Sequence, residues 1–178
     1  MASSLTHAYV GAALGALAPR WLRGPRFALL LAALAAAPDL DVVAFAFGIP
    51  YEHRFGHRGF SHSLLAAGLC AVAVWAWRYP SVRPLTARWW ALLLWIFAAT
   101  ASHGLLDAFT NGGRGIGFLI PFDDRRYFFP WRPLQVSSLN PLDFLTRHAL
   151  DVFGRELLWV WLPTTLVLLP ALLRRRRA

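Results

Sequence analysis

Apolar runs separated by short polar segments dominate this sequence and set its predicted architecture. All but the first approach or exceed the roughly 18 residues that a helix needs to cross the hydrocarbon core of a bilayer. The pattern predicts an all-α, polytopic membrane bundle of about five helices, the first of them short and buried against the others, forming one integral membrane domain over 1–178. The predicted helices cover 8–19, 27–48, 60–77, 89–110 and 156–173.

One sizeable polar segment, 111–155, interrupts the apolar pattern before the last run. Glycine and proline recur in it too often for a long helix, which predicts an irregular outer loop. Short strands at 117–120 and 127–129 can form at most a β-hairpin around Asp123 and Asp124. The aromatic and arginine side chains of this loop suit the lipid headgroup region.

Arginine clusters set the predicted orientation. They follow the first and third predicted helices and close the chain, so with five spans all three clusters share one side of the membrane. They contain ten arginines and no acid, which by the positive-inside rule makes that side cytoplasmic. The N-terminus is then predicted outside and the C-terminus inside. The clusters are Arg20, Arg23 and Arg26; Arg78, Arg83 and Arg88; and Arg174 to Arg177.

The composition agrees with a membrane protein and excludes several other classes. The chain is 57% hydrophobic and 15% charged, with a mean hydropathy of +0.46. Its formal net charge of +9 comes from arginines beside apolar runs, so it indicates orientation, and no nucleic-acid partner is expected. Cys70 is the only cysteine, which excludes an internal disulfide and a cysteine-type zinc site.

Imidazoles and acids interrupt the most apolar helices at nearly one depth. Four of them lie 13 to 16 residues from the arginines that flank their helices: His7, Asp39, His62 and His103. At about 1.5 Å per helical residue, all four are roughly 20–24 Å from one common plane. An ionised carboxylate at bilayer depth costs roughly 2.5–3.5 kcal/mol, so such groups at one level need a shared partner, and a metal cation is the natural one.

Two motifs supply acids at this depth. His103 and Asp107 are four residues apart, so both project from one helix face. Pro38 loosens the second helix, and Asp39 and Asp41, two residues apart, point to nearly opposite faces. One of these two acids is expected to bind a metal, with Asp39 favoured, while the other orients a ligand or faces water. Taken alone, each motif also fits a capped polar helix end or a helix break.

A third motif, His-Arg-Gly-Phe-Ser-His-Ser at 57–63, opens the third helix. His57 and His62 are five residues apart and do not align on a helix, but they can still converge, and which of them binds a metal stays open. Arg58 adds a donor fork suited to a phosphate or carboxylate oxygen. His7, at the start of the first helix, joins the candidate ligands because its depth matches theirs.

These residues predict a membrane-bound metal-dependent hydrolase that acts through metal-activated water. Zn²⁺ is favoured by mixed nitrogen and oxygen ligands, with Mn²⁺ or Fe²⁺ as alternatives. Asp41 and Arg58 are the predicted catalytic residues, one orienting a histidine or taking a proton and the other stabilising negative charge. Arg125 or Arg126 are weaker candidates for headgroup binding. Because the site opens near the outer leaflet, the expected partners are membrane lipid and a lipid-like or phosphorylated substrate.

Two other interpretations stay open. In a metal or proton transporter, the same histidines and acids would form a passage, which needs polar residues that continue to the cytoplasmic side. The inner halves of the helices, such as 29–34 and 71–75, offer none. In the third interpretation the metal is purely structural and holds the bundle together for a partner protein.

The order of these motifs resembles the YdjM-like family of bacterial and archaeal inner-membrane proteins, described as metal-dependent hydrolases. The resemblance rests on Thr-His at 6–7, Pro-Asp-Leu-Asp at 38–41, the motif at 57–63, His-Gly-Leu-Leu-Asp at 103–107 and the glycine-rich loop that begins at Thr110. It implies a hydrolase in the plasma (inner) membrane and does not fix the substrate.

The order of the candidate ligands is also similar to that of zinc phospholipase C and the P1-type nucleases, which are helical phosphoesterases. This second resemblance implies that His57 or His62 joins Asp39, His103 and Asp107 around one ion. It also implies that His7 helps to hold a second ion, which Asp107 bridges. The chain lacks the further His-x-x-x-Glu pair of those enzymes, so one or two ions are expected.

Overall fold

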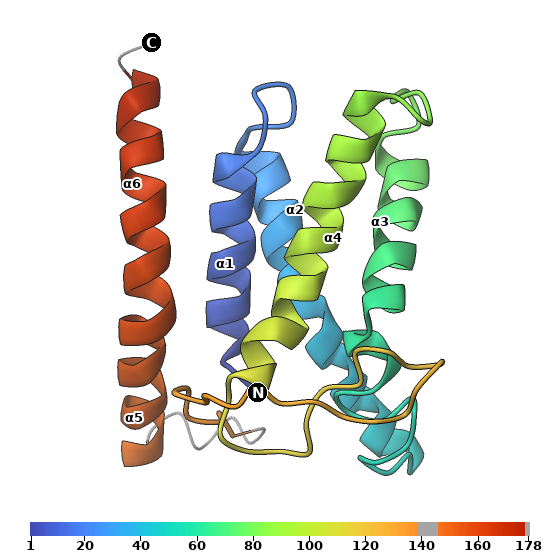
Figure 1. Cartoon of the computed structure of the whole chain (residues 1–178), viewed down its shortest axis with the longest axis vertical. Coiled ribbons are helices and arrows are strands. Elements are labelled where there is room, and N and C mark those ends of the chain that lie inside the picture. Colours follow the sequence, from blue (N-terminus) through green and yellow to red (C-terminus); the bar gives the residue numbers. More distant parts are fainter. Residues whose placement is uncertain (139–145, 177–178) are drawn as a thin grey trace.

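The computed structural model describes residues 1–138 and 146–176, the last three by their backbone only. Within the described residues it is helical, with loops and no β-sheet. Figure 1 shows the long helices of residues 4–108 side by side, and the helical stretch that begins at Arg147 along one flank. In chain order the elements are α1 (Ser4–Leu17), α2 (Pro25–Ala36), the 3-10 helix η1 (Ala37–Phe47), the 3-10 turn η2 (Phe60–His62), α3 (Leu64–Arg78), α4 (Ala87–Ala108), α5 (Arg147–Glu156), the π-helix η4 (Leu157–Trp161) and α6 (Leu162–Arg176).

Among the residues that the structure describes, three helical stretches are long and apolar enough to cross a membrane: Pro25–Phe47, Ala87–Ala108 and Arg147–Leu173. α3 is apolar but shorter, and α1 has 14 residues. Large apolar side chains stay exposed on these helices, for example Leu94 at 64% and Val167 at 66%, as expected of a surface that faces lipid. The prediction of an all-α membrane bundle is confirmed.

α1 packs closely against α2 because glycines line the contact. A side chain at Gly11 would overlap the backbone of Leu31, and one at Gly15 would overlap Ala28. Glycine at helix contacts is a common device for close packing in membranes. The antiparallel pair brings the start of α1 to the start of η1, where the Ser4 hydroxyl lies 3.4 Å from Asp39 Oδ2.

Local sequence sets the ends of the elements that carry the candidate site. α2 ends at Ala36 because Pro38 has no backbone N–H for an α-helical hydrogen bond, and the chain continues as the 3-10 helix η1. Ser63 caps α3 by accepting a hydrogen bond from the Ala66 backbone N–H at 3.0 Å. Asp39 and His62 are thus held at the two breaks in helical geometry.

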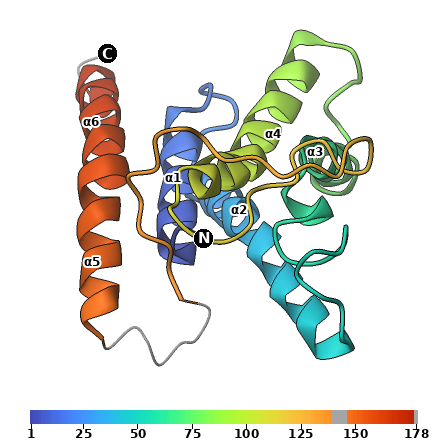
Figure 2. The same cartoon turned by 60° about the horizontal axis from the view of Figure 1, so that its bottom comes forward.

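The bundle has two chemically different ends. The α1–α2 loop, the α3–α4 loop and the C-terminal end of α6 lie at the top of Figure 1, and these segments, with the helix ends next to them, carry the arginine clusters. The side chains of Arg174–Arg177 lie outside the described residues. The segment 109–138 crosses the opposite end (Figure 2). Toward the arginine-rich end, the interior is an apolar core of Ala18, Leu22, Phe27, Leu31, Ala71, Val74, Leu92, Ile96 and Ala99.

The boundaries of the predicted outer loop need one correction. α5 begins at Arg147, so the prediction that 147–155 belong to an irregular loop is wrong. α5 is amphipathic and contains no continuous apolar run, so the apolar pattern of the sequence does not predict it. Ala149, Val152 and Glu156 are buried, at the spacing of one helix face, while the exposed positions combine Arg147, Asp151 and Arg155 with Leu150.

The loop also forms less β-structure than a paired hairpin. In its described part, the antiparallel contact is an isolated bridge between Ile116 and Tyr127, whose two backbone hydrogen bonds are both 2.9 Å. Pro121 and Pro130 lack backbone donors on either side of this bridge, so a regular ladder cannot extend across them.

Candidate metal centre

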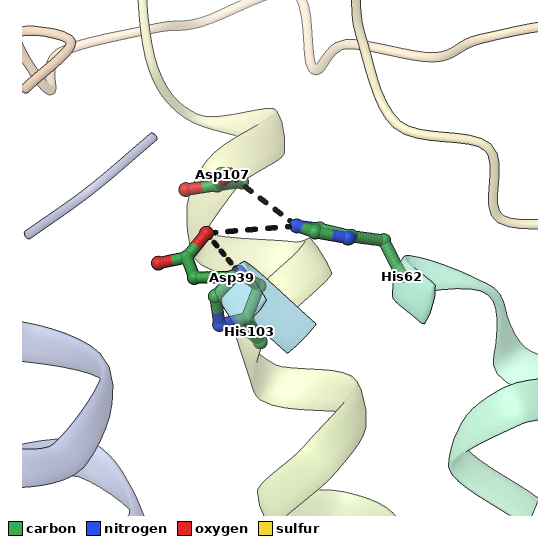
Figure 3. A group of neighbouring side chains, drawn as sticks. All are labelled: Asp39, His62, His103 and Asp107. Atoms are coloured by element: carbon green, nitrogen blue, oxygen red, sulfur yellow. Dashed lines mark ion pairs between the residues drawn. The ribbon is translucent and has the colours of Figure 1, made fainter. Parts of the chain in front are cut away.

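Four side chains from three elements point toward one another at the loop end of the bundle (Figure 3). Asp39 comes from η1, His62 from η2, and His103 and Asp107 from α4. Each offers one ligand atom, and these atoms all lie within 4.8 Å of one another. Asp39 Oδ1 is 3.2 Å from His103 Nε2 and 3.9 Å from His62 Nε2. His62 Nε2 is 4.0 Å from Asp107 Oδ2. We refer to these four residues as the His–Asp cluster.

The atoms that converge in the His–Asp cluster are buried and form no well-aligned hydrogen bond among the described residues, although Asp39 lies at ion-pair distance from His103 and Asp107 from Arg58. An unpaired buried polar group costs about 1–3 kcal/mol, and a charged one costs more. A tetrahedral zinc ion with bonds of about 2.0–2.2 Å separates its ligands by about 3.3–3.6 Å. The observed separations of 3.2, 3.9 and 4.0 Å are close to this range. Two imidazoles and two carboxylates in this arrangement therefore fit a divalent cation.

A backbone contact fixes the tautomer of His103. Its Nδ1 lies 2.7 Å from the carbonyl oxygen of Ala35. A carbonyl oxygen only accepts hydrogen bonds, so Nδ1 carries the proton and donates it. In the neutral ring, Nε2 then keeps its lone pair and faces Asp39, as a metal ligand requires.

Asp41 orients His62 from outside the His–Asp cluster. Its Oδ2 lies 3.2 Å from His62 Nδ1 and accepts the Ser61 hydroxyl at 2.5 Å, while its Oδ1 lies 2.6 Å from His57 Nδ1. A carboxylate beside Nδ1 favours a proton there, which again leaves Nε2 of His62 free to bind a metal. Asp41, His57 and His62 are a second group that can hold a cation, but the Asp41 oxygens are already paired in this group.

His7 lies beside the His–Asp cluster. It is fully buried, stacks on His103 with ring centroids 3.7 Å apart, and places Nε2 3.3 Å from Asp107 Oδ1. Neither ring nitrogen has a hydrogen-bond partner in the described chain. This position fits the implied role of His7 at a second ion that shares Asp107, and it equally fits a histidine that supports Asp107.

The Arg58 guanidinium is fully buried and is committed to the protein itself. Its Nε lies 3.1 Å from Asp107 Oδ2. Nη1 donates to the Gly112 carbonyl oxygen at 2.8 Å, and Nη2 donates to the Thr110 hydroxyl at 3.2 Å. These contacts favour a role in holding Asp107 over the predicted role of stabilising charge on a substrate.

Gly113 makes room for this guanidinium, so replacing it with alanine should destabilise the protein by about 1–3 kcal/mol. Its φ of +85° is strained for other residues, and an added Cβ would overlap Arg58 Nη1. Thermal unfolding in detergent measures the change. Gly68→Ala in α3 is the control, because a Cβ there meets nothing within 4 Å. Equal unfolding midpoints for the two variants would contradict the close packing of the loop on Arg58.

The two arginines proposed for headgroup binding are also engaged. Arg125 Nε donates to Asp123 Oδ2 at 2.8 Å, and this hydrogen bond lowers the pKa of the Asp123 carboxyl to about 2. Arg126 donates to the backbone carbonyl oxygens of His57 at 2.9 Å and Tyr51 at 3.1 Å. Arg126 thus braces the loop that carries His57.

Three contributors to the site were not singled out from the sequence. The Ala35 carbonyl leaves no sequence signal, because its role depends on how α2 and α4 pack. Ser4 is three residues before His7, a helical spacing that would have placed it near the site. Glu156 is an acid at the edge of an apolar run, a signal of the same kind as Asp39.

A polytopic helical membrane protein with a buried His–Asp cluster at one end is the class that this fold and site define. The chain belongs to the YdjM inner membrane protein family, which matches residues 1–178. It is 36% identical over 182 residues to the inner membrane protein YbcI of Escherichia coli (strain K12), covering 99% of this chain and 100% of that relative. No solved structure matches the chain. The family resemblance expected from the motifs is confirmed, and the protein is a bacterial inner-membrane protein.

Proposed function

We propose that this protein is a metal-dependent hydrolase of the inner membrane, a phosphoric ester hydrolase in the first instance. One observation carries the proposal: the ligand atoms of the His–Asp cluster converge within 4.8 Å, buried and without well-formed hydrogen bonds in the described part of the chain, with ion-pair contacts from Asp39 to His103 and from Asp107 to Arg58. Asp41 and His57, beside the cluster, form instead a short hydrogen bond of 2.6 Å.

The residues present suit one divalent ion. His7 would help to hold a second ion if one binds. Asp39, His62, His103 and Asp107 would hold the first ion, and mixed nitrogen and oxygen donors favour Zn²⁺, with Mn²⁺ or Fe²⁺ permitted. A bound ion of this kind makes water a nucleophile near neutral pH and polarises an ester oxygen. Asp41 keeps His62 in its ligand tautomer, and Arg58 keeps Asp107 in place.

The proposed substrate class is based on the surroundings of Asp39. Asp39 is the least buried member of the His–Asp cluster at 7%, and the adjacent Leu40 is 70% exposed on a membrane-spanning stretch. An amphiphile in the bilayer can therefore approach a carboxylate ligand from its apolar side. A lipid or lipid-linked phosphoester is the substrate class we propose.

The proposed orientation puts the arginine-rich end of the bundle in the cytoplasm and the site in the outer half of the membrane. Supporting this, the α1–α2 loop with Arg20 and Arg23 and the α3–α4 loop with Arg83 lie at the end opposite segment 109–138. Cysteine accessibility from outside intact cells, at Ser81 in one loop and Ser138 in the other, measures the orientation.

A transporter remains the competing function, and the structure offers it little support. Passage to the cytoplasmic side would cross the apolar core of Phe27, Leu31, Leu92 and Ile96, and the nearby buried hydroxyl of Thr100 donates to the Ile96 carbonyl oxygen. A transported ion would have no charged partner in this core.

Purified protein in detergent tests the proposal with two measurements. We expect about one or two zinc ions per chain by elemental analysis, and hydrolysis of a chromogenic phosphodiester or phosphomonoester that stops with a chelator and returns with zinc. Metal flux into liposomes without hydrolysis would instead support transport. Absence of bound metal after purification in zinc-containing buffer would remove the hydrolase proposal altogether.

A further inference from the structure

Glu156 is a buried acid that the proposed hydrolysis does not use. It is fully buried within the last membrane-spanning stretch, where an acid is costly unless it is paired. Three donors pair it: the Ser3 backbone N–H at 2.5 Å on Oε1, and the hydroxyls of Ser3 at 2.6 Å and Thr6 at 2.8 Å on Oε2. Glu156 thus binds the first turn of α1.

That turn of α1 leads directly into the candidate metal centre. The Ala2 backbone N–H donates to Asp107 Oδ1 at 2.6 Å, and His7, which follows Thr6, lies 3.3 Å from the same oxygen. The Ser3 side chain also accepts a hydrogen bond from the Thr6 backbone N–H at 3.2 Å, which caps α1. The N-terminal segment is therefore held by hydrogen bonds on two sides, to Glu156 and to Asp107.

The last helical stretch is attached to the bundle around the same point. Trp161 Nε1 donates to the Thr6 hydroxyl at 2.7 Å, and its ring stacks on Tyr9 with centroids 4.3 Å apart. The π-helix η4 begins directly after Glu156 and ends at Trp161. Further along, α6 exposes Leu166 and Val167 to lipid. Glu156 and Trp161 therefore hold the last stretch against α1 at the level of the His–Asp cluster.

We propose that Glu156 is a positioning residue of the candidate metal centre: it fixes the first turn of α1 and thereby holds His7 against Asp107 and His103. The inference rests on the proposed function to the extent that the centre binds a metal. It assigns the last helical stretch a part in building the site as well as in anchoring the chain.

Glu156→Gln tests this role, because an amide offers one acceptor where the carboxylate offers two. The backbone N–H and the two hydroxyls can no longer all donate to it. We expect zinc affinity, measured by titration of the full chain in detergent, to fall about 10-fold. Thr6→Val, which removes one of the hydroxyls, should weaken zinc binding in the same direction. Asp151→Asn, an exposed acid on the same helix, is the matched control and should leave affinity unchanged.

A double variant separates positioning from general loosening of the fold. If Glu156 acts through His7, Glu156→Gln should cause no further loss of zinc affinity in a His7→Ala background. An equal loss in both backgrounds, or no loss in the single variant, would overturn the inference.

Hydrogen exchange distinguishes failure of this inference from failure of the proposed function. Should the wild-type chain bind no zinc, the hydrolase proposal fails, and positioning is still measured by amide protection of residues 2–7. Loss of protection there in Glu156→Gln, with residues 90–100 unchanged, supports the inference, and unchanged protection at 2–7 overturns it.

Discussion

Replacing His103 with alanine should remove stoichiometric zinc binding, together with any ester hydrolysis that the wild-type chain supports. His103 presents Nε2 to Asp39 at 3.2 Å and is fixed through Nδ1 by the Ala35 carbonyl oxygen. Residues that only orient zinc ligands already change metal affinity by about 10–100-fold, so loss of a ligand should cost at least about 100-fold. Elemental analysis and zinc titration of the purified protein measure the loss.

A second ligand variant and a control make this prediction specific. Asp107→Asn keeps the shape of the side chain and removes its charge, so it should lose zinc to a similar extent if Asp107 is a ligand. His53→Ala changes an exposed loop histidine outside the His–Asp cluster and should retain full metal content. Full zinc retention by both His103→Ala and Asp107→Asn would exclude the His–Asp cluster as the metal site.

The helices could be predicted from the sequence to the extent that they face lipid. α4 and the α2–η1 stretch are near-continuous apolar runs, because both lipid and the protein core accept apolar side chains. α5 lies at the edge of the bundle and is half polar, so apolar runs do not reveal it. The loop around Ile116 and Tyr127 depends on contacts with distant residues, such as the Gly117 N–H donating to the Arg58 carbonyl oxygen at 3.0 Å.

The members of the candidate site could be found because membrane helices rarely contain acids and imidazoles. His103 and Asp107 follow from helical spacing alone, and the matching depths of Asp39 and His62 indicate convergence. The sequence could not separate His57 from His62, because the turn at 57–63 is irregular. It also could not show that Arg58 is turned toward Asp107, which depends on the fold of 110–113.

The charges of the buried side chains explain why Arg58 lies beside Asp107. Asp39 and Asp107 bring two negative charges into the His–Asp cluster, and Arg58 supplies one positive charge in direct contact. A bound divalent ion adds two positive charges, so the two carboxylates are then balanced without Arg58. Arg58 therefore stabilises the cluster when no ion is bound, and its importance should fall as an ion binds.

Arg58→Met should consequently destabilise the protein by about 3–5 kcal/mol in the presence of a chelator, the usual cost of removing one partner of a buried ion pair. Methionine fills much of the same volume, so the effect reports mainly the uncompensated charge of Asp107. Zinc should recover a large part of the loss, because a bound ion stabilises the folded state and now provides the missing positive charge. Thermal unfolding in detergent, with chelator and with zinc, gives both quantities.

The matched control is Arg54→Met in the same loop. Arg54 pairs with Asp124 at 2.6 Å, but both side chains are about half exposed at 55% and 51%, so this pair is worth at most about 1 kcal/mol. Its loss should shift unfolding little, and by the same amount with chelator and with zinc. If Arg58→Met behaved like Arg54→Met, or if zinc stabilised Arg58→Met no more than the wild type, Arg58 would not be the cation that balances the empty cluster. A zinc-dependent difference confined to Arg58→Met would instead tie the stability of this end of the bundle to metal binding.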